Sequence, residues 1–173
     1  MPITQSLLTD GSSLTETNSY TTASISPSAN QLVLVAIQSI DSPSVGNTPT
    51  LSGASMTWVE VASVTTRENP HTKLTLFRGL SASPESGVLT IDFAGQDQFR
   101  VIWAVSEFDS VDTGGANGAD AVVQAVTEVD LAAPTSLTVT LAAFGSTDNA
   151  TYGTFVGQAS STTDMTPGTV LQR

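Results

Sequence analysis

Residues 31–40 read QLVLVAIQSI, the most continuously apolar stretch of a chain of 173 residues. Turn-forming residues border it on both sides, SPSAN at 26–30 and a Ser- and Pro-containing loop at 41–49. A short apolar run between turn signals, rich in β-branched residues, is typical of a strand that is buried on both faces. We therefore expect residues 31–40 to form the central strand of a sheet.

Apolar and polar residues alternate elsewhere in the chain, and no window keeps apolar residues at helical spacing for three turns. Eight or nine short strands separated by polar turns predict an all-β fold, a two-sheet antiparallel sandwich of jelly-roll or Greek-key topology. Besides residues 31–40, strands are expected at residues 15–25, 56–65, 73–80, 88–93, 99–108, 121–129, 136–144 and 152–158.

The length of the chain predicts a single domain. Residues 1–18 are rich in Ser and Thr, and we expect them to form an N-terminal arm that becomes ordered only on docking. Residues 19–173 are then the sandwich domain.

The chain has 16 acidic and five basic residues, a formal net charge of −11, and no cysteine. Disulfides and thiolate metal sites therefore contribute nothing to its stability. A surface of this sign repels nucleic-acid phosphates and anionic lipids, so we expect neither a nucleic acid nor a membrane as partner.

The first residues, MPITQSLLTDGSS, lack the basic start and the apolar run of a secretion signal. We therefore expect synthesis to end in the cytoplasm, although a cysteine-free composition rich in Ser and Thr suits work outside a cell. A virus particle reconciles these two observations, because its proteins are made in the host cytoplasm and act outside it.

Four stretches between residues 26 and 124 carry a resemblance that runs from about residue 25 to residue 155. They read SPSANQLVLVAIQ, PTLSGASMTWVEVASV, KLTLFRGLSASPESGVLTIDFAG and VIWAVSEFDSVDTGGANGADAVVQ. In this succession the chain resembles a family of jelly-roll-like β-sandwich domains of phage structural proteins, such as decoration and fibre proteins, and of bacterial surface proteins. The resemblance implies a building block of a particle or surface. It brings no set of catalytic residues with it.

The longest break in the strand pattern is DSVDTGGANGAD at residues 109–120. It places the oxygen ligands Asp109, Asp112, Asn117 and Asp120 in one glycine-rich stretch, and Ca²⁺ takes such ligands. The spacing is not that of an EF-hand, and long loops use the same residues for their turns. A calcium site and an ordinary loop are therefore the two interpretations, and no other cofactor is expected.

Two tryptophans lie inside alternating segments. Trp103 has apolar neighbours on both sides and is expected in the core. Trp58 is the candidate for an exposed ring that stacks on a sugar, which is the signature of a glycan-binding module.

Catalysis is not expected. His71 is the only histidine, it follows Pro70 in a predicted turn, and no G-x-S-x-G elbow is present. Sugar hydrolysis would need two carboxylates beside a cleft, for which Glu60, Glu107 and Asp92 are the candidates. Carboxylates on the strands of an acidic protein usually form the wet face of a sheet.

These observations predict a non-enzymatic structural protein of a phage virion. The first choice is a capsid decoration or cement protein on the particle exterior, and the second is a head or tail fibre component. Its expected partners are the major capsid protein or other virion proteins and further copies of itself, for example in a trimer. The alternatives are a glycan-binding adhesion module of a phage or bacterial surface protein, and a surface module of a larger exported protein.

Overall fold

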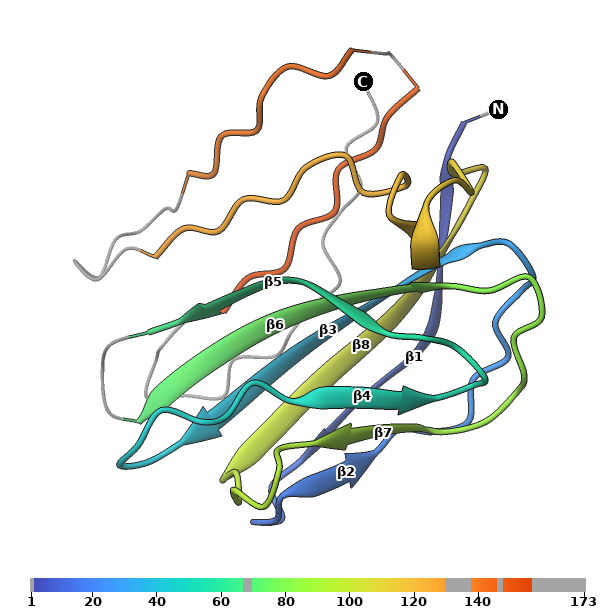
Figure 1. Ribbon diagram of the computed structural model, residues 1–173. Helices are drawn as coiled ribbons and strands as arrows, with labels where there is room; N and C mark the ends of the chain where they lie inside the picture. Colours follow the sequence, from blue (N-terminus) through green and yellow to red (C-terminus); the bar gives the residue numbers. More distant parts are fainter. Residues whose placement is uncertain (1, 67–69, 130–137, 146–147, 157–173) are drawn as a thin grey trace.

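The computed structural model describes residues 2–66, 70–129, 138–145 and 148–156. In this part of the chain it contains eight β-strands and one short 3-10 helix, η1 (Ala116–Gly118). The strands form two antiparallel sheets that pack face to face (Figure 1), which confirms the predicted all-β sandwich. None of these residues forms a helix long and apolar enough to cross a membrane.

The larger sheet has five strands in the order β1-β8-β3-β6-β5, and the smaller sheet has three in the order β2-β7-β4. The strands are β1 (Thr4–Ser13), β2 (Ser19–Thr21), β3 (Leu32–Asp41), β4 (Thr50–Gly53), β5 (Val59–Thr65), β6 (His71–Leu80), β7 (Leu89–Asp92) and β8 (Arg100–Asp109).

The strand pairing is nested, because β1 pairs with β8, β2 with β7 and β3 with β6. Pairing the first strand with the last, and so on inward, is the wrapped topology of an eight-stranded jelly roll. β5 departs from this scheme, since it pairs with β6 at the edge of the larger sheet. β8 ends at Asp109, and none of the described residues after it joins either sheet.

β3 is the predicted central strand, and it is hydrogen-bonded to β6 on one side and to β8 on the other. Six consecutive side chains from Leu32 to Ile37 are at most 6% exposed, so both faces of the strand are buried. The face toward the smaller sheet carries Val33, Val35 and Ile37, and the opposite, outer face carries Leu32, Leu34 and Ala36.

The main core lies between the two sheets. Phe93 is fully buried at its centre, and its ring meets that of Tyr20 edge-on at a centroid distance of 6.0 Å. The Tyr20 hydroxyl donates to the Gln98 carbonyl oxygen at 2.8 Å, so the polar end of this ring is also satisfied. The other buried members are Ile25, Val33, Val35, Ile37, Ala54, Phe77, Leu89, Ile91, Val101, Trp103 and Val105.

The N-terminal residues do not form the predicted arm. Thr4–Ser13 is the edge strand β1, which pairs with β8 at both of its ends, with a shift of register between Leu7 and Thr9. Gly11 allows this pairing, because a Cβ at that position would lie 2.7 Å from the ring of Trp103. The Ser- and Thr-rich composition reflects an edge strand with many exposed side chains, and such a strand has the same composition as an arm.

The three strands predicted after residue 120 are not found as paired strands among the described residues. Residues 123–129, 138–145 and 148–156 are extended segments without regular secondary structure that lie over the larger sheet (orange in Figure 1). The remaining parts of those predictions, residues 136–137 and 157–158, lie outside the described residues.

Candidate functional site

An apolar groove lies between the outer face of the five-stranded sheet and the chain that follows β8. The floor of the groove is formed by leucines of β3 and β6 and by Phe108, and its cover includes Val122 and Tyr152. The cavity between floor and cover measures about 520 Å³. A cavity of this size lies within the range that small ligands and peptide side chains occupy.

The loop after β8 directs the chain onto this face. Gly118 in η1 is buried, and a Cβ there would lie 3.1 Å from both Leu32 and Leu80, so only glycine fits without displacing the floor. Its φ of +75° is also in the region that favours glycine. Sequence and packing therefore agree that this loop docks closely against β3 and β6.

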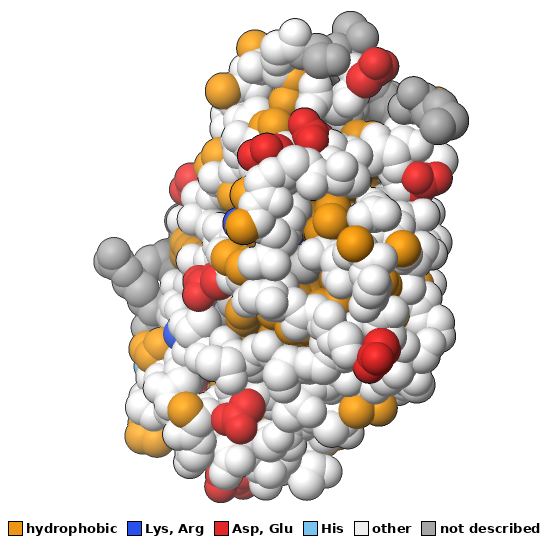
Figure 2. Space-filling model, turned by 45° about the vertical axis from the view of Figure 1, so that its right-hand side comes forward, with side chains coloured by type: hydrophobic (Ala, Val, Ile, Leu, Met, Phe, Trp, Pro, Cys, Tyr) orange, Lys and Arg blue, Asp and Glu red, His pale blue; other side chains and the backbone are white. Residues whose placement is uncertain are grey.

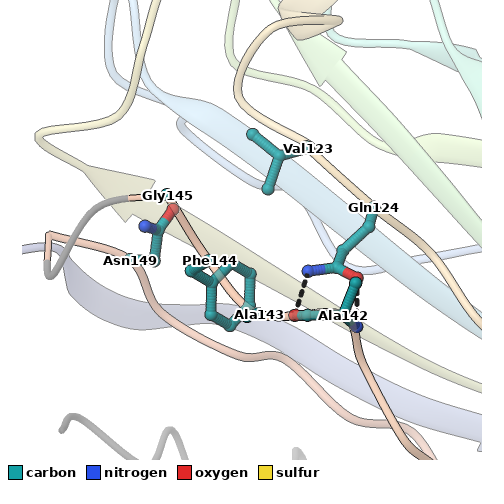
Figure 3. A pocket seen from close by; sticks show the side chains of 7 residues that line it. All are labelled: Val123, Gln124, Ala142, Ala143, Phe144, Gly145 and Asn149. Carbon is teal, nitrogen blue, oxygen red and sulfur yellow. Dashed lines mark hydrogen bonds between the residues drawn. The ribbon is translucent and has the colours of Figure 1, made fainter.

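A second hollow of about 430 Å³ adjoins the groove (Figure 3), because Val123, Phe144 and Asn149 line both. Gln124 also lines both, and its side chain lies beside Ala142. Gln124 Nε2 donates to the Ala142 carbonyl oxygen at 3.0 Å, and the Ala142 N–H donates to Gln124 Oε1 at 2.9 Å. One side-chain amide thus binds both backbone groups of a single residue.

Tyr152 anchors the cover to the sheet. Its ring meets Phe108 edge-on at a centroid distance of 5.6 Å. Burial raises the pKa of the Tyr152 hydroxyl, and the side chain of Ser106, which is itself fully buried, partly offsets this rise. Gln5 of β1 donates to the same Ser106 oxygen at 3.1 Å, so Ser106 interacts with both β1 and the cover.

The raised pKa of Tyr152 predicts a loss of stability at high pH. In the folded protein the hydroxyl keeps its proton above pH ~10, where an unfolded tyrosine loses it, so the stabilisation is present below pH ~10 and declines above it. Wild type should therefore lose more melting temperature than Tyr152→Phe between pH ~8 and pH ~11. Burial also raises the pKa of Tyr20, but Tyr20 is present in both proteins, so its effect cancels in the comparison. Parallel melting curves for the two proteins would contradict this prediction.

The structure brings two of the four predicted calcium ligands together. A Cβ on Gly114 would lie 2.5 Å from Asp120 Oδ2 and 3.1 Å from Asp112 Oδ1, so these carboxylates flank the same glycine. Asp109 instead accepts a hydrogen bond from the Ser110 N–H, and Asn117 has a left-handed φ of 53°. Among the described residues no three His, Cys, Asp or Glu side chains are grouped as a metal site would need.

The calcium prediction can be tested directly. If the loop binds Ca²⁺, millimolar calcium should raise the melting temperature by mass action, and a chelator should reverse the rise. Asp112→Asn and Asp120→Asn should each remove the response, because they neutralise the two carboxylates that converge. An identical melting temperature with calcium and with chelator would show an ordinary loop.

The candidate catalytic carboxylates do not converge. Glu60 on β5 and Glu107 on β8 are three strand positions apart in the larger sheet, about 14 Å at the usual strand spacing, and Asp92 belongs to the smaller sheet. A glycosidase pair needs a separation below about 10 Å. Glu107 is buried and accepts hydrogen bonds from the Ser28 N–H and hydroxyl, so it holds a loop in place. His71 begins β6 instead of lying in a turn.

The two tryptophans differ in exposure. Trp103 is 7% exposed and belongs to the main core, which confirms the prediction. Trp58 is half-buried: its ring packs against Gly79, and its Nε1 donates to the Gly53 carbonyl oxygen at 3.2 Å. One part of this indole is therefore available to a ligand, and its orientation is fixed.

Sequence reasoning missed the groove and the residues that shape it, Gln124 and Tyr152. Its walls come from strands β3 and β6 and from residues beyond 120, which are distant in the sequence. The apolar residues at even positions of β3 and β6 were the available signal, because they imply that something covers the outer face.

Comparison of the sequence with protein-family models and curated proteins, and of the structure with solved structures, finds no match.

Proposed function

We propose that this chain is a non-enzymatic structural protein of a phage virion, a capsid decoration or cement protein on the outside of the shell. A head or tail fibre component is the nearest variant of this role. The observation that carries the proposal is an acidic, cysteine-free β-sandwich with an apolar groove on the outer face of its larger sheet. Figure 2 shows hydrophobic side chains along the middle of one face, with acidic side chains scattered around them.

The proposed mechanism is association. A protein that binds the assembled shell, and not its separated subunits, stabilises the shell by mass action, by about 2.7 kcal/mol per site at a concentration one hundred times Kd. Apolar surface at the groove supplies the contact area, and a stable contact needs roughly 1,200–2,000 Å² in total.

The net charge of −11 supports an exterior location. A packaged genome is a dense array of phosphates, and an acidic surface is repelled by it. Mutual repulsion between free copies also keeps them soluble before they reach the particle. The expected partners are the major capsid protein or other virion proteins and sister copies.

The deciding experiment is quantitative mass spectrometry of purified particles. A decoration protein is present in a number of copies comparable to that of the major capsid protein, whereas a fibre component is present in a handful. Absence of this polypeptide from particles would overturn the proposal.

The half-exposed, fixed indole of Trp58 favours one alternative, a glycan-binding adhesion module. This alternative predicts that the isolated chain binds a glycan array and that Trp58→Leu loses the signal while the protein stays folded. An array without signal for the wild type would remove it.

A further inference from the structure

Arg78 lies beside the apolar floor of the groove with one of its nitrogens unsatisfied. It is opposite Leu34, a residue that lines the groove, in the pairing of β3 with β6, so both side chains are on the outer face of the larger sheet. Its neighbours on the same face of β6 are Leu76 and Leu80. The guanidinium Nε of Arg78 is buried and has no hydrogen-bond partner in the described structure. A buried, charged donor of this kind favours an acceptor that the chain does not supply.

A hydroxyl donor lies in the same row of the sheet. Ser106 of β8 is opposite Leu34 on its other side, so Arg78, Leu34 and Ser106 lie side by side across neighbouring strands. Arg78 and Ser106 are two strand spacings apart, about 10 Å. The Tyr152 hydroxyl is buried near Ser106 and makes no hydrogen bond of ordinary geometry. An anionic group above Leu34 would therefore lie between a cation and a hydroxyl donor.

The floor next to this row is apolar. Its lining residues there include Val61, Leu74 and Leu76, and the cavity of about 520 Å³ lies between them and the cover. Ligand pockets of this size are mostly apolar and carry a few polar groups that fix the orientation of the ligand. Glu128 is the only acidic residue among the described residues that line the cavity, and it is exposed, so dissolved salt screens its charge.

We infer that the groove binds a free aliphatic carboxylate, that is, a fatty acid. The carboxylate accepts hydrogen bonds from Arg78 and from the Tyr152 hydroxyl, and the alkyl chain lies over Leu74 and Leu76 beneath the cover. Hydrogen bonds between arginine and a carboxylate are strong because both groups are charged. This inference goes beyond the proposed function and does not depend on it.

The test is isothermal titration calorimetry of the full chain with octanoate, decanoate and 1-octanol at 0.15 M salt. Decanoate should bind about 10-fold more tightly than octanoate, because the groove buries two more methylene groups. Octanoate should bind more tightly than 1-octanol, which has the same chain length and cannot form an ion pair with Arg78.

Arg78→Gln should weaken the binding of octanoate about 10-fold and leave the binding of 1-octanol unchanged, because it removes only the charged partner of the carboxylate. Lys73→Gln is the matched control. Lys73 lies on the same strand but is opposite Ser39, on the inner face of the sheet, so octanoate should bind this variant as it binds wild type. A circular dichroism spectrum like that of wild type shows that each variant is folded.

Ala62→Phe tests the location of the alkyl chain. Ala62 of β5 lines the cavity, and a phenylalanine ring there would enter the space that the chain needs, so both octanoate and 1-octanol should no longer bind. Binding of octanoate to this variant with the affinity of wild type would place the site elsewhere and overturn the inference.

Three other results would overturn the inference. They are a wild type that does not bind decanoate, equal affinities of wild type for octanoate and 1-octanol, and equal weakening of octanoate binding by Arg78→Gln and Lys73→Gln. None of them bears on the copy number of the protein in purified particles, which tests the proposed function separately.

Discussion

Replacing Phe93 by alanine is expected to destabilise the protein by about 3–5 kcal/mol, the usual cost of removing a buried phenylalanine. The ring is fully buried between the two sheets and contacts Tyr20 edge-on. Its removal leaves a cavity between the two sheets, and the lost contacts with both sheets add to the cost of removing the ring from the core. Equilibrium unfolding in urea, monitored by tryptophan fluorescence, measures the change.

Phe99→Ala is the matched control for this substitution. The Phe99 side chain is 42% exposed, although its backbone N–H is bonded to the Ile40 carbonyl oxygen, which alanine preserves. Its loss should cost less than about 1 kcal/mol. Equal losses for the two variants would mean that the space between the sheets is not the main source of stability.

The strands that pack on both faces were the most predictable part of the fold. The apolar run at 31–40 corresponds to β3 (Leu32–Asp41), and the run at 99–108 corresponds to β8 (Arg100–Asp109), each shifted by one residue. A strand that is buried on both faces has a continuous run of apolar residues in the sequence, and turn residues border that run. The two-sheet sandwich could be predicted, but which strands pair could not, because the pairing depends on contacts between strands that are distant in the sequence.

Strands at the edges left weaker signals. β4 (Thr50–Gly53) reads TLSG, is mostly exposed, and resembles a loop in sequence. β1 (Thr4–Ser13) reads as a polar arm for the same reason. Conversely, residues 121–129 alternate like a strand and are unpaired among the described residues. The alternation of apolar and polar residues indicates which side chains are buried, but it does not identify the partners of the backbone hydrogen bonds.

The candidate sites could be predicted only where they are local in sequence. The acidic loop was recognised from its composition, and the structure brings Asp112 and Asp120 together within it. The groove was not recognised, because its floor and its cover include residues far apart along the chain, such as Leu34 and Tyr152, which belong to one cluster only in the folded protein. Phe99 begins the predicted strand 99–108 but is exposed, and Phe144 of the predicted strand 136–144 is half-buried in the cover.

Gly53→Ala is the second substitution with a large expected effect. Gly53 ends β4 with a φ of +116°, a conformation that costs an L-residue about 1–3 kcal/mol. A Cβ there would also collide with the Val88 carbonyl oxygen, a backbone atom that cannot swing aside without moving the β7 partner strand. Trp58 Nε1 donates to the Gly53 carbonyl oxygen, so a shift of this residue also disturbs the indole. The melting temperature should fall by about 2–4 °C for each kcal/mol lost.

Gly87→Ala separates backbone strain from the general effect of adding a methyl group. Gly87 forms an isolated bridge with Ile25, an added Cβ there would meet no atom within 4 Å, and its φ is outside the left-handed region. Alanine should leave the stability within about 0.5 kcal/mol or raise it slightly, because it restricts the unfolded chain. If Gly53→Ala has the melting temperature of wild type and Gly87→Ala has a lower one, β4 is not held against β7 as the structure describes. If only Gly53→Ala is destabilised, the close approach of β4 to β7 depends on the missing side chain of Gly53.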